Sequence, residues 1–266
     1  MNRYALKIEY MGTPFHGWQK QPGLETVQGA INVALKNLDP FSDGVTGAGR
    51  TDAGVHATGQ VAHLDLEKTW DANKLQQALN FYLKPKLISI IASVKVDSNF
   101  HARFSAVKRH YIFKIVNRMP PLTIEKNRYW QIRRPLDIEK MRHGASYLIG
   151  KHDFTTFRST LCQAKSPIKS IDKINIVRVE SFMGPLIHVE FDAQSFLHNQ
   201  IRSITGTLVK VGSNSWLPQR VELALSARNR MECGPVAPPW GLYLTKVDYE
   251  KNIFINNTKL KGQHTI

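Results

Sequence analysis

The order in which strand-like and helix-like segments follow one another is the feature that most limits how this chain can fold. Residues 4–10 alternate between apolar and polar side chains, which predicts a half-buried strand. Apolar residues recur at helical spacing over 26–38, and Asp71 is placed to cap a second helix. Three further strands are predicted, at 44–49, 57–66 and 87–96. The resulting order, β-α-β-β-α-β, is typical of a ferredoxin-like (RRM-like) unit.

The second half of the chain resembles the first in this order. Strands are predicted at 108–117, 173–180, 185–191 and 241–249, and helices at 137–149, 196–211 and 218–228. A basic, Pro-rich connection separates the first of these strands from the first helix. We therefore predict an α/β (α+β) chain made of two ferredoxin-like halves, 1–105 and 106–266, each with a largely antiparallel sheet.

The charge of the chain indicates what kind of partner it binds. Lys and Arg total 36 against 21 Asp and Glu, a formal net charge of +15. This balance favours a polyanionic partner, nucleic acid before a membrane surface. Because the basic residues are spread along the chain, we expect a folded basic surface and not a disordered basic arm.

Other features of the composition favour a cytoplasmic protein. No apolar run approaches the roughly 18 residues that a transmembrane helix needs, and the first residues lack the apolar block of a signal peptide. The two cysteines, Cys162 and Cys233, are too few for a disulfide framework and lack the spacing of a metal site.

The segment "GAGRTDAGVHATGQVAH" (47–63) is the strongest candidate for a functional site. It is no P-loop, because no Gly-Lys-Ser/Thr follows the glycines, and it lacks the third glycine of a dinucleotide fingerprint. One interpretation is a glycine-rich turn in which Asp52 is an ordinary turn residue. The other is chemical: Arg50 lies close enough to keep the Asp52 carboxylate ionised, and an ionised carboxylate in a dry site is a usable nucleophile.

Two other candidates have equally plain alternatives. Tyr111 shares a strand face with apolar neighbours, which is typical of a core tyrosine, although an aromatic ring is also a suitable platform for a flipped base. Arg202 lies at the edge of the apolar stripe of its helix, as does His198, and a snorkelling surface arginine fits that position. Lys108 and Arg109, beside Tyr111, suit RNA phosphates or simple solvation.

Taken together, several segments resemble one known family. "GRTDAGVHATGQVAH" is similar to the signature of the tRNA pseudouridine synthase A (TruA) family. The further matching segments, in chain order, are "YMGTPFHGWQKQPGLETVQGAINVAL" (10–35), "FHARFSAVKRHYIF" (100–113), "FLHNQIRSITGTLVKVG" (196–212) and "APPWGLYLTKVDY" (237–249). The resemblance implies two ferredoxin-like halves whose sheets meet around a central basic active-site cleft.

The resemblance also implies roles for individual residues. Asp52 corresponds to the catalytic nucleophile of the family, and Arg202 to the basic residue that pairs with it. Tyr111 corresponds to the tyrosine that stacks on the target uracil, with Leu242 as an apolar wall for the base. Arg50 is expected to support the space that the flipped uridine leaves.

The expected RNA contacts are more widely spread. The segment 158–167 matches the family only loosely, so Gln163 and Lys165 are the weaker part of this prediction. The predicted contacts are Lys68, Phe100, His101, Ala102, Arg103, Phe104, Arg118, Gln163 and Lys165. The loop 17–21 is also expected to face RNA, although Trp18 fits equally well as a hydrophobic plug, and we assign His56 and His63 to packing or hydrogen bonding.

The implied activity is the isomerisation of uridine to pseudouridine at positions 38, 39 and 40 in the anticodon stem-loop of tRNA. The resemblance implies no cofactor and no metal, and a homodimer with its dimer contacts in the second half. Two alternatives stay open: a non-catalytic RNA-binding module, against which the absence of a clear RNP motif speaks, and a relative that modifies different uridines.

Overall fold

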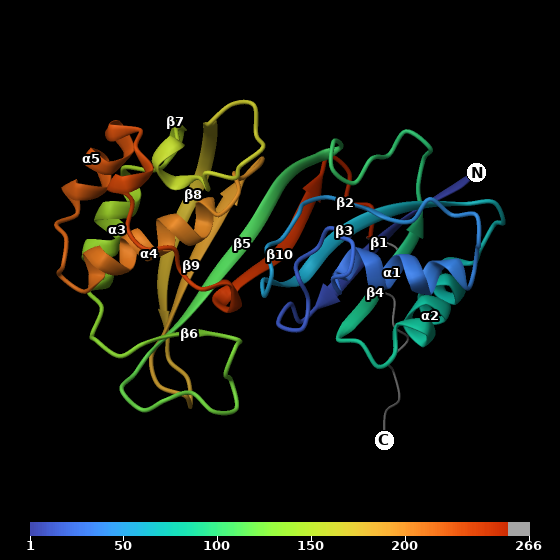
Figure 1. Ribbon diagram of the computed structural model, residues 1–266, viewed down its shortest axis with the longest axis horizontal. Coiled ribbons are helices and arrows are strands. Elements are labelled where there is room, and N and C mark those ends of the chain that lie inside the picture. Colours follow the sequence, from blue (N-terminus) through green and yellow to red (C-terminus); the bar gives the residue numbers. More distant parts are fainter. Residues whose placement is uncertain (255–266) are drawn as a thin grey trace, which may run out of the picture.

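The strands of residues 1–254, the part of the chain that the computed structural model describes, form one ten-stranded sheet (Figure 1). The strand order is β4-β1-β3-β10-β5-β9-β8-β7, with β2 paired to β3 and β6 paired to β5. Residues 255–266, the end of the predicted second half, lie outside the described residues. The α+β class and the largely antiparallel pairing predicted from the sequence are confirmed.

The first half follows the predicted β-α-β-β-α-β order. Thr26 caps the first helix by accepting a hydrogen bond from the Gly29 amide, and Asp71 caps the second by accepting from the Lys74 amide. Within the sheet, β4, β1, β3 and β2 are neighbours in that order, all antiparallel. The elements are β1 (Asn2–Tyr10), α1 (Val27–Lys36), β2 (Thr46–Gly47), β3 (His56–Leu66), α2 (Ala72–Leu83) and β4 (Ile88–Lys95).

The second half adds a longer series of elements. They are β5 (Ala106–Asn117), β6 (Trp130–Ile132), α3 (Ile138–Ser146), β7 (Gly150–Asp153), β8 (Ile168–Val179), β9 (Leu186–Ala193), α4 (Gln200–Gly212), α5 (Gln219–Ala227) and β10 (Leu242–Tyr249). Three short 3₁₀ helices are also present, η1 (Thr155–Phe157), η2 (Arg230–Glu232) and η3 (Pro239–Gly241). The short strands β6 and β7 were not predicted.

The start of α4 differs from the prediction. A helix beginning at residue 196 was expected, but α4 begins at Gln200. Asn199 adopts a left-handed conformation (φ 62°), which no residue inside a right-handed helix can have. Residues 196–199 therefore form a turn that leads into the helix.

The last strand, β10, joins the two halves into a continuous sheet. It pairs antiparallel with β5 along most of its length, and parallel with β3 at Tyr243–His56 and Leu244–Ala57. The chain thus returns from the second half to lie beside the first. The boundary near residue 105 between two domains stays a prediction.

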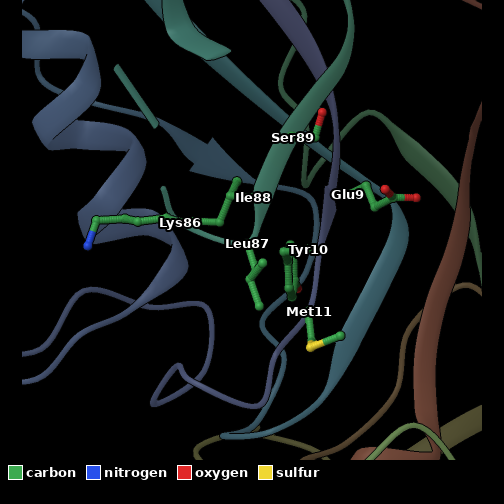
Figure 2. Close-up of a pocket in the computed structure, with 7 residues that line it drawn as sticks. All are labelled: Glu9, Tyr10, Met11, Lys86, Leu87, Ile88 and Ser89. Atoms are coloured by element: carbon green, nitrogen blue, oxygen red, sulfur yellow. The ribbon is translucent and has the colours of Figure 1, made fainter. Parts of the chain in front are cut away.

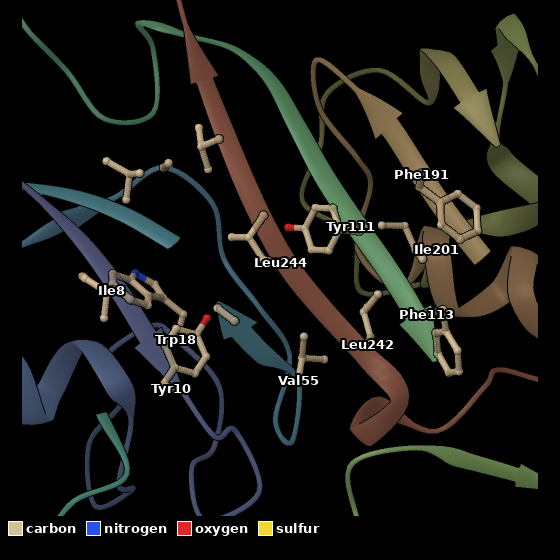
Figure 3. Packing of buried hydrophobic residues seen from close by; sticks show 14 of the residues in the cluster. Ile8, Tyr10, Trp18, Val55, Tyr111, Phe113, Phe191, Ile201, Leu242 and Leu244 are labelled. Atoms are coloured by element: carbon tan, nitrogen blue, oxygen red, sulfur yellow. The ribbon is translucent and has the colours of Figure 1, made fainter. Parts of the chain in front are cut away.

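Helices cover the two parts of the sheet separately. In Figure 1, α1 and α2 lie against the first four strands, whereas α3, α4 and α5 lie together beside β8 and β9. Figure 3 shows buried side chains of both parts close together around the central strands: Tyr10, Trp18 and Val55 from the first half, Tyr111 and Leu244 from β5 and β10. Within the described range, no helix combines the length and the apolar character needed to span a membrane.

Candidate active site

The loop that joins β2 to β3 carries Asp52 and is held on several sides. The Tyr10 and Thr51 hydroxyls lie 2.7 Å apart in the interior. The Gln60 side chain donates to the Gly49 carbonyl at 2.9 Å, and the Trp18 amide donates to the Thr51 carbonyl at 3.0 Å. These contacts fix the backbone on both sides of Arg50 and directly before Asp52.

Two glycines of the segment 10–18 allow that segment to lie directly against the Asp52 loop. A Cβ on Gly12 would sit 2.0 Å from the Val55 carbonyl oxygen, and one on Gly17 would sit 2.6 Å from the Thr51 carbonyl oxygen. Gly17 also has φ +86°, a conformation that glycine adopts far more readily than other residues. The two segments singled out in the sequence are thus packed together, backbone against backbone.

The Asp52 carboxylate is held by two side chains from the second half, an arginine and a histidine. Arg202 Nη1 donates to Asp52 Oδ2 at 3.0 Å, and His198 Nε2 lies 3.3 Å from Asp52 Oδ1. Burial alone would raise the pKa of Asp52, but the hydrogen bonds and positive charges of His198 and Arg202 outweigh it and hold that pKa below its usual range. Asp52 is therefore ionised at neutral pH while a quarter of its side chain is exposed.

Arg202 is itself oriented by its surroundings. Its Nε donates to the Ala237 carbonyl at 2.8 Å, and its Nη1 also donates to Asn199 Oδ1 at 2.8 Å. The Ala237 amide in turn donates to the Arg202 carbonyl at 3.0 Å. Since its side chain is only 17% exposed, the snorkelling interpretation of Arg202 is wrong.

His198 is the residue of this group that the sequence did not single out for a role. The sequence places it only beside Arg202, at the edge of the apolar stripe. In the structure it lies in the turn before α4, where its carbonyl accepts a hydrogen bond from the Ser159 amide. Its contact with Asp52 raises the pKa of His198 above the ordinary value. The spacing of His198 and Arg202 is the signal in the sequence that could have found this role. It predicts that the two side chains lie on one helix face, but not that both contact Asp52.

Tyr111 and Leu242 lie close to the centre of the sheet and are nearly buried, at 8% and 5% exposure. The Tyr111 ring meets the edge of the Phe196 ring with centroids 5.3 Å apart, and Figure 3 shows its hydroxyl directed across β10 toward the first half. A Cβ on Gly49 would lie 3.7 Å from that hydroxyl, which places the ring beside the Asp52 loop. Burial raises the pKa of Tyr111, so the phenol is neutral.

Arg50 is exposed, unlike Asp52. The side chains of Arg50 and Asp52 therefore have different environments although they come from the same loop. Within residues 1–254 the structure gives Arg50 no hydrogen bond or ion pair. The expectation that Arg50 keeps Asp52 ionised is not supported by these contacts, because Arg202 and His198 do so instead.

Arg109 is not a phosphate-binding residue in this structure. Its guanidinium is buried and donates to four backbone carbonyls, those of Ala48, Arg103, Ala106 and Gln194. The alternatives considered for it, RNA contact or solvation, are both wrong because its hydrogen-bonding capacity is used inside the protein. It links the Asp52 loop to the loop before β5.

The residues predicted to contact RNA differ in how far their side chains are exposed to solvent. Ala102 is fully buried, so its side chain has no surface to offer, and Phe100 packs against Tyr249 with ring centroids 5.0 Å apart. Arg118 donates to the carbonyls of Pro120, Pro121 and Met183, and so stabilises two loops. The exposed members of the set are Lys68, Arg103, Phe104, Gln163 and Lys165, with His101 half-buried.

The structural roles expected for the two histidines are confirmed. His56 accepts from the Gly12 amide at 3.0 Å and stacks on Tyr243. His63 accepts from the Ala102 amide at 3.2 Å, and burial together with nearby positive charge lowers its pKa to about 4. Trp18 is 2% exposed, so it is the hydrophobic plug and not an RNA-facing side chain.

Two hollows of the surface lie away from Asp52. The larger, of about 290 Å³, is lined by the ends of β1 and β4, including Tyr10, Lys86 and Leu87 (Figure 2). A second, of about 160 Å³, lies beside Lys151 and Gln194. Neither includes Asp52, so the candidate site is identified by its contacts and not by the depth of a pocket. Among the described residues, no group of three or more His, Cys, Asp or Glu side chains is placed to hold a metal ion.

Comparison with known sequences identifies one family. A family model described as tRNA pseudouridine synthase matches residues 7–105 and 145–250, more than half of the chain. Three similar curated proteins, each called tRNA pseudouridine synthase A, come from Ruegeria sp. (strain TM1040), Dinoroseobacter shibae and Paracoccus denitrificans. They are 50%, 52% and 54% identical to this chain, and the alignments cover 94% or more of it and 97% or more of each relative.

Proposed function

The chain belongs to the tRNA pseudouridine synthase family, and from that premise we propose that it isomerises uridine to pseudouridine in tRNA with Asp52 as its nucleophile. The observation that carries the proposal is the contact of the Asp52 carboxylate with Arg202 and His198, on a loop that also faces Tyr111. In this reaction the N1–C1′ bond of uridine breaks and a C5–C1′ bond forms, while C5 loses its proton to solvent and N1 takes one up.

Asp52 is suited to nucleophilic catalysis because it is ionised and only partly hydrated. Water around a carboxylate would have to be removed before attack, and three quarters of this side chain is already shielded. Arg202 supplies the positive charge that keeps it ionised, and the hydrogen bonds from Arg202 to Ala237 and Asn199 fix the direction of that charge.

Tyr111 and Leu242 are the residues that we propose contact the uracil. The Tyr111 ring is a flat platform on which a base that has left its stack can lie. Because its phenol is neutral and nearly buried, it offers the base an apolar face next to the ionised Asp52. We propose that Leu242, buried at the start of β10, serves as an apolar wall for the base.

Arg50 is the residue that we propose occupies the place of the flipped uridine. Its side chain is exposed while its backbone neighbours are fixed by Gln60 and Trp18, so it can enter the RNA without disturbing Asp52. Lys68, Arg103, Gln163 and Lys165 are exposed and suit contacts to RNA phosphates.

The finer features of the function come from the family resemblance. We propose that the target uridines are those at positions 38, 39 and 40 of the anticodon stem-loop, and that the protein acts in the cytoplasm as a homodimer with dimer contacts in the second half. The two halves, 1–105 and 106–266, then form the two sides of the basic cleft.

Tritium release tests the proposal. Wild-type protein is expected to release tritium from tRNA that carries 5-tritiated uridine, whereas Asp52→Asn releases none and still binds tRNA. Asparagine has nearly the shape of aspartate and lacks its charge, so loss of activity with binding retained identifies the carboxylate. Wild-type protein that binds tRNA and releases no tritium would favour the RNA-binding module instead.

A further inference from the structure

The proposed isomerisation needs a group that accepts a proton, and the assignment of that group rests on the proposed function. When C5 of the uracil bonds to C1′, C5 still carries the hydrogen that it had in uridine. That hydrogen must leave as a proton, so that the electrons of the C5–H bond restore the C5=C6 double bond. A side chain that takes the proton in this step speeds it, because water is a weak base.

Most of the titratable side chains around the site are poor proton acceptors at neutral pH. The guanidinium groups of Arg50 and Arg202 stay protonated. Burial raises the pKa of Tyr111, so its phenol keeps its proton. The contacts with His198 and Arg202 hold the pKa of Asp52 below its usual range, which makes the carboxylate a weak base. The imidazole of His198 is the remaining group in contact with Asp52, and an imidazole accepts a proton near neutral pH.

The geometry of His198 leaves one ring nitrogen available for this purpose. Its Nε2 lies 3.3 Å from Asp52 Oδ1, and an ionised carboxylate only accepts hydrogen bonds, so Nε2 carries the proton that faces Asp52. In the neutral ring the lone pair is then on Nδ1, for which the described part of the chain provides no hydrogen-bond partner. The side chain is 41% exposed, so a proton taken up by Nδ1 can pass on to water.

The segment that carries His198 is held beside both ends of the proposed uracil site. The His198 carbonyl accepts a hydrogen bond from the Ser159 amide at 2.9 Å. Asn199, the next residue, is left-handed and accepts from Arg202 through its side chain. Phe196, two residues earlier, packs against the Tyr111 ring. The imidazole therefore comes from a fixed turn that contacts the neighbours of Asp52 on one side and Tyr111 on the other.

We propose that His198 is the general base that removes the C5 proton. Its Nδ1 accepts the proton from C5, directly or through one water, the electrons of the C5–H bond restore the C5=C6 bond, and the imidazolium gives the proton to solvent. N1, released when the N1–C1′ bond broke, takes up a proton from water. The charged groups that face His198 are Asp52, which raises the pKa of the ring above its ordinary value, and Arg202, which lowers it to a smaller extent. The net effect makes His198 a stronger base than a free imidazole.

Two substitutions test this role by the rate of tritium release in a single turnover on tRNA that carries 5-tritiated uridine. General bases contribute about a hundredfold or more to a rate, so His198→Ala is expected to slow release by about that factor. His198→Gln keeps an N–H group that can reach Asp52 but has no basic nitrogen, so it is expected to lose as much. Both variants should bind tRNA as tightly as wild type.

Two further readouts separate proton transfer from the orientation of Asp52. Imidazole added to the buffer is expected to restore part of the rate of His198→Ala. Deuterium at C5 in place of ordinary hydrogen should slow pseudouridine formation more in His198→Ala than in wild type, because cleavage of the C5–H bond then limits the rate. His143→Ala, which removes an exposed histidine on α3 that contacts Tyr147, is the matched control and should leave rate and isotope effect unchanged.

A His198→Gln protein as active as wild type would overturn the general base, because glutamine retains only the hydrogen bond to Asp52. A slow His198→Ala protein with the isotope effect of wild type and no response to imidazole would overturn it too, since its loss would then come from a misdirected carboxylate. In both cases release of tritium by wild type leaves the proposed function intact. A wild-type protein that releases none would overturn the proposed function and the general base together.

Discussion

At the scale of single residues, the chemistry of the site depends on the Asp52 carboxylate, whose pKa is shifted in opposite directions by burial and by its two partners. Burial favours the neutral acid, and the contacts with His198 and Arg202 favour the anion. The partners prevail, because Arg202 donates directly to one carboxylate oxygen and His198 lies against the other. Asp52 thereby stays ionised although burial by itself would raise its pKa.

Removal of Arg202 should therefore change the pH dependence of the reaction. Without the guanidinium, His198 alone opposes the effect of burial, so the pKa of Asp52 rises. Because the reaction needs the carboxylate, the acid limb of the kcat/KM profile of Arg202→Ala is expected to move to higher pH than in wild type. At neutral pH the rate should also fall, by about a hundredfold, because the carboxylate loses its fixed direction.

Two variants sharpen that measurement. Arg202→Lys retains the charge without the forked geometry, so its acid limb should stay near that of wild type while its rate at neutral pH falls. Arg142→Ala removes an exposed arginine that pairs with Glu139 and should alter neither property. An acid limb of Arg202→Ala that coincides with that of wild type would mean that Arg202 does not control the ionisation of Asp52.

At the scale of elements, the sequence predicted the helices and strands that a local pattern determines. It missed the features that depend on tertiary contacts. Alternation and capping residues identified the long strands and the starts of α1 and α2, because these signals lie within a few adjacent residues. The start of α4 was misplaced because the left-handed conformation of Asn199 is not visible in an apolar stripe. The strands β6 and β7 are three and four residues long, too short to show alternation, and exist because longer neighbours pair with them.

The junction between β3 and β10 depends on a glycine for its close approach. A Cβ on Gly59 would lie 2.1 Å from the Thr245 carbonyl oxygen, so Gly59→Ala must push β10 away from β3. Overpacking of this kind costs about 1–3 kcal/mol. We expect a lower free energy of unfolding in urea by about that amount, together with reduced activity, since β3 carries the Asp52 loop and β10 carries Leu242.

Thr58→Ala is the control for this prediction, because Thr58 is an exposed neighbour on the same strand. It should leave both stability and activity close to wild type. Unfolding of Gly59→Ala at the wild-type urea concentration would contradict the importance given to this junction.

At the scale of the whole molecule, the site exists only where the two halves meet. Asp52 comes from the first half, His198 from the turn before α4, Arg202 from the first turn of α4, and Tyr111 from β5. The family resemblance identified Asp52, Arg202 and Tyr111 as site residues. The distances between them depend on β10, which returns to pair with both β3 and β5. The roles of Arg109 and His198 could not be predicted, because both depend on partners far away in the chain.

The net charge of the molecule predicts how it binds tRNA. A surface that tracks phosphates releases counterions on binding, so affinity should fall steeply as salt rises. For four or more phosphate contacts, the slope of log K against log salt is expected to be about −3 or steeper. A slope near zero between low and moderate salt, measured with wild-type protein and tRNA, would exclude a phosphate-tracking cleft.

The most direct measurement is a map of the pseudouridines in tRNA from a strain that lacks this protein, before and after treatment with purified wild-type or Asp52→Asn protein. Wild type is expected to introduce pseudouridine at positions 38, 39 and 40, and Asp52→Asn is expected to introduce none at those positions while binding the same tRNA. Pseudouridine at these positions after treatment with Asp52→Asn would contradict the role given to Asp52, and pseudouridine only at other positions would contradict the proposed substrate site.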